Sequence, residues 1–184
     1  MNFNKHLNLE GQHAFLSASK YHWVNYNSEK LELAFGKYLA AQQGTRIHEF
    51  ACECIRLGVK LPKTKKTLNM YVNDAIGFKM ETEQTLYYSN NCFGTADAIS
   101  FKNNFLRIHD LKTGVSPTSH KQLEIYTALF CLEYGKKPND IEVELRLYQL
   151  DEVSIHVPSP EDIMYIMEKI ITFDKQIEKL KIGE

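Results

Sequence analysis

The stretch that most constrains this 184-residue sequence is segment 92–114, CFGTADAISFKNNFLRIHDLKTG. Two runs of alternating polarity flank Asn103-Asn104, and asparagine tolerates the positive φ that a two-residue hairpin turn requires. We therefore predict two antiparallel strands in which the numbers of opposite residues sum to 207. This register makes four opposite pairs on one side of the sheet: Phe101 with Leu106, Ile99 with Ile108, Asp97 with Asp110, and Thr95 with Lys112.

The charged end of this hairpin carries two carboxylates and a lysine on the same side as the apolar pairs, since side chains alternate along a strand. Directly opposed Cβ atoms lie about 4.5–5.5 Å apart, so Asp97 and Asp110 repel each other unless a cation lies between them. A divalent metal is the simplest explanation. The alternative is a surface hairpin with solvated acids, and a register shift of one residue would separate the pair. The other side is predicted to carry Ala96, Ala98, Ser100, Arg107, His109 and Leu111.

The composition is that of an ordinary soluble globular protein, with 43% hydrophobic and 24% charged residues. The length suits a single domain, 1–184. No apolar run approaches the roughly 18 residues of a membrane span, and the first residues lack the apolar region of a signal peptide. We therefore expect a cytoplasmic protein without a membrane partner. The net charge of −1 means that a nucleic-acid partner would need a local basic patch.

Hydrophobic spacing predicts the other elements, and their order indicates an α/β (α+β) fold. A helical segment covers the first 43 residues, and a clearer helix opens at Gly44-Thr45 and ends at Gly58. The lysine-rich connector 60–66 is either a solvated loop or a phosphate contact. The later elements are a helix at 67–80, a strand at 83–89, a helix from Ser116-Pro117 to Gly135, strands at 141–150 and 153–157, and a long C-terminal helix at 159–181.

The predicted chemistry follows from the residue types near the acidic pair. His48 lies in the first turn of the helix at 44–58, and a lone histidine there is more often structural unless a metal requires a nitrogen ligand. Two carboxylates and an imidazole suit Mg²⁺ or Mn²⁺ better than zinc. Such an ion aligns a water with a phosphodiester and stabilises the charge that develops. Lys112 could orient or deprotonate that water, or screen the phosphate.

Four ordered segments, GTRIHEF, GTAD, HDLKTG and QLEIY, resemble the PD-(D/E)XK nuclease superfamily, in particular its RecB-like and phage exonuclease branch. The resemblance covers 44–150 and implies a restriction-endonuclease-like core, with a mixed β-sheet flanked by helices. The resemblance implies that the metal ligands are His48, Asp97, Asp110 and the backbone carbonyl of Leu111. It implies that Asp97, Asp110 and Lys112 are catalytic and that Gln122 and Tyr126 position DNA. Glu49 would have a less defined role beside the histidine.

Two departures from the family pattern limit what the resemblance implies. The first acidic motif is Ala-Asp rather than Pro-Asp, which changes no chemical group. The iron–sulfur cysteines of the CRISPR-associated and helicase-linked members are missing, because Cys52, Cys54, Cys92 and Cys131 do not match their spacing. We expect reduced thiols and no iron–sulfur cluster. The sequence also lacks GxxxxGK[ST], so we expect a stand-alone nuclease or one subunit of a machine.

The sequence thus predicts a Mg²⁺- or Mn²⁺-dependent DNA exonuclease for recombination or end-processing, of the kind that phages and mobile elements carry. Its expected partner is DNA, with a recombination or replication protein as a further candidate, and its compartment is the bacterial cytoplasm if a phage encodes it. An endonuclease acting on DNA or RNA would use the same site. A catalytically idle nuclease fold that binds nucleic acid or a protein is the other alternative. The intact His48, Asp97, Asp110 and Lys112 argue against it.

Overall fold

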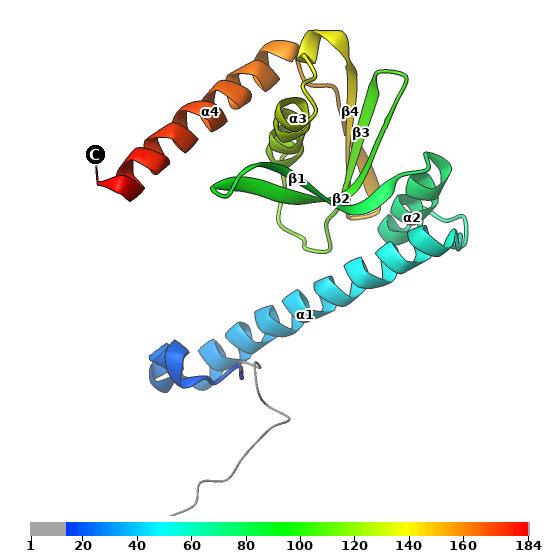
Figure 1. Cartoon of the computed structure of the whole chain (residues 1–184). Coiled ribbons are helices and arrows are strands. Elements are labelled where there is room, and N and C mark those ends of the chain that lie inside the picture. The colour runs from blue at the N-terminus through cyan, green and yellow to red at the C-terminus, as the bar shows by residue number, and fades with distance from the viewer. Residues whose placement is uncertain (1–13, 184) are drawn as a thin grey trace, which may run out of the picture. The chain divides into compact units, whose positions relative to one another are not determined.

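The computed structural model describes residues 14–183 and contains a five-stranded sheet in the order β1-β2-β3-β4-β5 (Figure 1). The β3–β4 pair is parallel and the other three pairs are antiparallel, so the sheet is mixed. Helix α3 connects β3 to β4, as a parallel pair requires. The predicted α/β class is confirmed. The strands are β1 Glu81–Ser89, β2 Cys92–Lys102, β3 Phe105–Leu111, β4 Glu142–Gln149 and β5 Glu152–His156.

Helices pack on both faces of the sheet (Figure 1). One core lies between the sheet and helices α3 and α4, and is built on buried residues such as Leu106, Leu129 and Ile163. The other lies beneath α2 and the last turns of α1, around Val72 and Tyr148. The helices are α1 Ser28–Leu57, α2 Thr67–Gly77, α3 Lys121–Glu133 and α4 Pro160–Ile182, with 3₁₀ helices at Ala18–Asn25 and Pro138–Asp140.

The register of the β2–β3 hairpin is the predicted one. Its ladder pairs Ile99 with Ile108 and continues to the turn, and the turn residues Asn103 and Asn104 have φ values of 53° and 58°. The positive φ values are those of a type I′ turn, whose twist matches that of the strands. The last ladder pair before the charged end joins Ala98 to His109. Asp97 and Asp110 therefore lie immediately beyond the paired part of the hairpin.

The strict alternation predicted for β2 is wrong between Ala96 and Ala98. Ala96 is buried in the core under α3 and α4, whereas Ala98 is buried in the core under α2. The β1–β2 ladder omits Glu83 and Asp97, which lie opposite each other, and Glu83 has a φ of 51°. A local irregularity of this kind bends a strand and changes which face the following side chains meet.

Helix α1 also differs from the prediction, because it runs unbroken for 30 residues from Ser28 to Leu57 and does not open at Gly44. One glycine in a helix costs only about 1 kcal/mol relative to alanine, and the Ala-Ala-Gln-Gln run before it favours continuation. Gly58 does end the helix, as predicted, with a φ of 66°. The chain divides into two compact units, one up to Thr45 and one from Arg46 onward.

Each unit has its own packing. In the first unit, the ring of Phe15 contacts those of Phe35 and Tyr38 at centroid distances of 5.1 and 5.2 Å. In the second, Ser159 caps α4 by accepting a hydrogen bond from the backbone N–H of Asp162 at 3.1 Å. Between residues 14 and 183, no helix is both long and apolar enough to cross a membrane.

Candidate active site

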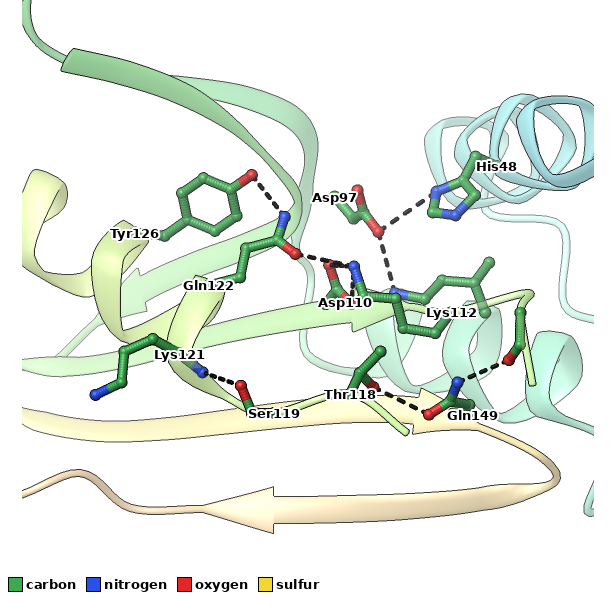
Figure 2. A network of polar contacts seen from close by, with 12 residues as sticks. His48, Asp97, Asp110, Lys112, Thr118, Ser119, Lys121, Gln122, Tyr126 and Gln149 are labelled. Atoms are coloured by element: carbon green, nitrogen blue, oxygen red, sulfur yellow. Dashed lines mark hydrogen bonds and ion pairs between the residues drawn. The ribbon is translucent and has the colours of Figure 1, made fainter. Parts of the chain in front are cut away.

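Four elements of the second unit bring the predicted site residues together (Figure 2). Helix α1 carries His48, strand β2 carries Asp97, and strand β3 ends at Asp110 and Leu111, just before Lys112. Helix α3 carries the other two side chains, Gln122 and Tyr126. In Figure 2 they lie on one side of Lys112 and His48 lies on the other.

Asp97 joins the hairpin to α1. Its Oδ2 atom accepts a hydrogen bond from the backbone N–H of Leu111 at 3.0 Å and lies 3.4 Å from Nδ1 of His48. Burial raises the pKa of the Asp97 carboxyl, and the negative charge of Asp110 raises it further. The Leu111 N–H, His48 and Lys112 act in the opposite direction. The negative charge of Asp110 therefore acts on Asp97, which lies opposite it in the predicted hairpin register.

Asp110 is almost completely buried, with 3% of its side chain exposed. The Nζ atom of Lys112 lies 2.9 Å from its Oδ2 and 3.1 Å from its Oδ1. The geometry supports a hydrogen bond to Oδ1, whereas Oδ2 is a buried acceptor without one. The ammonium nevertheless lies within ion-pair distance of Oδ2, so Lys112 is the partner of both carboxylate oxygens of Asp110.

Lys112 connects the acidic pair to α3. Its ammonium also donates to Oε1 of Gln122 at 2.9 Å, and Nε2 of Gln122 donates to the hydroxyl of Tyr126 at 3.0 Å. A continuous polar network thus runs from buried Asp110 through Lys112 and Gln122 to Tyr126 (Figure 2). The lysine retains 27% exposure, so the network opens to solvent.

The donor types fit a hard divalent cation, although the described residues include no group of three or more His, Cys, Asp or Glu side chains arranged to hold a metal. Carboxylate and carbonyl oxygens with one imidazole are ligands that Mg²⁺ and Mn²⁺ accept. The buried Oδ2 of Asp110, without a hydrogen bond, is an acceptor that a cation could satisfy. In this structure the positive charge beside it is that of Lys112. The ligand roles of His48, Asp97, Asp110 and the Leu111 carbonyl remain predictions.

Two other predicted residues have distinct surroundings. The side chain of Leu111 is 1% exposed and belongs to the core under α2, so only its backbone faces the acidic pair. Glu49 is exposed and lines a hollow of about 380 Å³ together with Cys52, Arg56 and Glu83. Within residues 14–183, no hydrogen bond or ion pair joins Glu49 to the network.

His109, the histidine of the HDLKTG segment, belongs to the core and not to this site. Its side chain is fully buried, with Nδ1 at 3.3 Å from the hydroxyl of Tyr148 and its ring edge-on to Phe78. Burial, followed by the charges of Arg146 and Arg107, lowers the pKa of His109 to about 3. The imidazole is therefore neutral at physiological pH.

Sequence reasoning missed Gly94 as a positioning residue. A Cβ atom at this position would lie 2.8 Å from Cε1 of Tyr126, closer than real Cβ contacts come. The absence of a side chain on β2 therefore lets the ring of Tyr126 pack against the strand. The signal was present in the GTAD segment, where a glycine inside a strand indicates close approach of another group.

Gln149 was also missed, and it holds the loop between Lys112 and α3. Its Nε2 donates to the carbonyls of Gly114 and Ser116 at 2.7 and 2.8 Å, and its Oε1 accepts from the hydroxyl of Thr118 at 3.0 Å (Figure 2). One side chain on β4 thus makes hydrogen bonds to three residues of the loop. These contacts span more than 30 residues, and no local pattern predicts them.

Replacement of Gly94 by alanine is expected to displace the Tyr126 ring and to break its hydrogen bond with Gln122. Overpacking of this kind costs about 1–3 kcal/mol, measured by urea unfolding. The Gly94→Ala change should cost little in a Tyr126→Ala background, because the added methyl then has room. Gly77→Ala is the control, since no heavy atom lies within 4 Å of its added Cβ. An equal cost of Gly94→Ala in both backgrounds would contradict this packing.

Comparison with known proteins adds no assignment: no family model, curated protein or solved structure matches this chain. The function of this site is therefore inferred from its geometry and from the four sequence segments that supply its residues.

Proposed function

We propose that this protein is a Mg²⁺- or Mn²⁺-dependent DNA nuclease of the PD-(D/E)XK type, acting as an exonuclease. The observation that carries the proposal is the acidic pair itself. Two carboxylates, one with a raised pKa and one almost completely buried, lie beside a partly exposed lysine and a histidine. The four segments that supply these residues are the four that resemble the family.

A purely structural role explains this arrangement less well. A buried acid is normally paired with an opposite charge, because a like charge nearby adds to the cost of burying it. Here the negative charge of Asp110 raises the pKa of Asp97, and the cation beside Asp110 is the partly exposed Lys112. Two carboxylates held close together beside an imidazole are typical of catalytic sites.

In the proposed reaction, the chain's own residues bind and orient the reactants. Asp97 and Asp110 would hold the cation together with His48 and the Leu111 carbonyl, and the bound cation lowers the pKa of a water and stabilises charge on the phosphate. Lys112 lies where its ammonium can orient the attacking water or contact the scissile phosphate. Gln122 fixes that ammonium, and the hydroxyl of Tyr126 extends the polar surface available to the DNA backbone.

A catalytically idle, nucleic-acid-binding fold is the second candidate. The observation in its favour is the ion pair between Lys112 and Asp110, together with the lack of a closed metal-binding group among residues 14–183. In such a protein the lysine would permanently neutralise the acid that a nuclease uses for metal.

One assay separates the two candidates and the endonuclease alternative. End-labelled linear DNA, circular DNA and RNA are incubated with the protein in Mg²⁺, Mn²⁺ or EDTA, and metal binding is followed by the melting temperature. We expect degradation of linear DNA with circles spared, no cleavage in EDTA, and a higher Tm with either ion, because a ligand that binds the folded state stabilises it. Cleavage of circles would instead indicate an endonuclease. Binding of DNA without cleavage, and without a metal-dependent Tm shift, would support the idle fold.

A further inference from the structure

The turn between β4 and β5 contains one residue, Leu150, that does not suit its backbone. Leu150 and Asp151 have φ values of 51° and 59°, nearly the same as Asn103 and Asn104 in the β2–β3 hairpin. Asparagine and aspartate adopt this left-handed conformation readily, whereas leucine does so at a steric cost. Strained residues of this kind concentrate at functional sites and persist when the surrounding structure holds them.

Asp151 has a structural role that accounts for its presence. Its Oδ1 accepts hydrogen bonds from the backbone N–H and the hydroxyl of Thr67, at 2.8 and 3.1 Å, and its own N–H donates to that hydroxyl at 2.7 Å. These bonds fix the turn to the first residue of α2. Leu150 has no comparable explanation, because its side chain is 62% exposed and contributes little to the core.

Leu150 instead forms one wall of a pocket of about 320 Å³ beside the candidate active site. The pocket shares Leu111 and Lys112 with that site, so a group bound there lies next to the proposed scissile phosphate. Ile47, Leu68 and Leu111 add further aliphatic lining, and Thr67, Thr113 and Asp151 add polar lining. A larger pocket of about 400 Å³ between α3 and α4 shares none of the predicted site residues.

We infer that this pocket binds the base of the terminal nucleotide of the DNA strand being degraded, with Leu150 as an apolar wall against the base. The inference rests on the proposed nuclease function. The pocket volume is at the lower end of the range of ligand sites, about 300–1,000 Å³, which suits one nucleoside and excludes a duplex. Enzymes that take a base out of its stack hold it between apolar or aromatic side chains. Lys112 at one edge places the phosphate beside the pocket.

The test exploits the strain at Leu150. Leu150→Asn relieves the left-handed conformation and should raise Tm by about 2–4 °C, while removing the apolar wall. Initial cleavage rates are measured on linear duplexes whose terminal nucleotide, at the 5′ or the 3′ end, either carries its base or is an abasic analogue. Burial of a base against aliphatic walls is favourable, so we expect the wild type to prefer the base-bearing end by roughly tenfold. In Leu150→Asn this ratio should fall towards one.

Asn103→Leu is the matched control, because it creates the same strain in the β2–β3 hairpin, whose turn is no part of the pocket. It should lower Tm and leave the preference for a base intact. Equal cleavage of the two ends by the wild type, or an unchanged ratio in Leu150→Asn, would overturn the base pocket while leaving the nuclease standing. Failure to cleave any substrate would overturn the nuclease, and the base pocket with it.

Discussion

Asp110→Asn is expected to abolish phosphodiester cleavage and most of the metal-induced rise in Tm. A neutral amide is a far poorer ligand than a carboxylate for a hard divalent cation. The substitution keeps the size and shape of a side chain that is 3% exposed, so it changes charge without creating a cavity. Loss of activity would then reflect the missing negative charge and not a repacked core.

The same variant should keep the stability of the metal-free protein within about 1 kcal/mol of the wild type, because two effects oppose each other. Neutralising residue 110 removes the repulsion that raises the pKa of Asp97. It also weakens the contact with Lys112, although the amide oxygen can still accept from the ammonium, and Lys112 retains its bond to Gln122. A loss of several kcal/mol would identify Asp110 as a structural acid.

The pH dependence of stability gives a second reading of this pair. Because the folded pKa of Asp97 lies above its ordinary value of 3.8, Asp97 contributes stability that is present below pH 3.8 and is lost as pH rises through the folded pKa. Asp110→Asn removes the second-largest cause of that shift and should reduce the loss. Urea unfolding at several pH values measures this loss of stability with rising pH. The control is Asp140→Asn, a change at an exposed residue on a separate 3₁₀ helix. Near wild-type cleavage by Asp110→Asn would show that the active-site assignment is wrong.

The hairpin was predictable from sequence because its register depends on local information. Two asparagines determine the turn, the turn determines which residues lie opposite, and Asp97 and Asp110 follow from that count. The shared face of Gln122 and Tyr126 was predictable for a similar reason, since the two residues are four apart on a helix. Both features depend on fewer than 25 consecutive residues. The predicted start of that helix at Ser116-Pro117 is wrong, because α3 begins at Lys121.

The missed features depend on contacts between distant segments. The reversal between Ala96 and Ala98 arises with the left-handed residue Glu83 on a different strand, and alternation within β2 alone carries no trace of it. Gly94 matters because a ring on α3 packs against it. The unbroken helix through Gly44 shows a different limit, because a single glycine signals a possible end without requiring one.

Lys112→Ala is expected to abolish cleavage as well, while metal affinity moves in the opposite direction to that in Asp110→Asn. The ammonium of Lys112 lies 2.9 Å from Oδ2 of Asp110, so it competes with any cation that binds this carboxylate. Removing a positive charge from the site should strengthen Mn²⁺ binding, by up to about tenfold, or 1.4 kcal/mol. The reaction nevertheless stops, because the group that orients the water or contacts the phosphate is gone.

The metal-free Lys112→Ala protein should be less stable than the wild type by about 1–3 kcal/mol, because Asp110 is left buried without a partner. Bound Mn²⁺ replaces the lost positive charge, so the metal-induced Tm shift should exceed that of the wild type. Lys112→Met separates charge from packing, since it keeps most of the side-chain volume and should bind metal like the alanine variant. Lys102→Ala, an exposed change near the turn of the same hairpin, controls for a general loss of charge. If Lys112→Ala and Asp110→Asn lose metal equally while both stay folded, Lys112 is a structural partner of Asp110 and the site described here is not a nuclease centre.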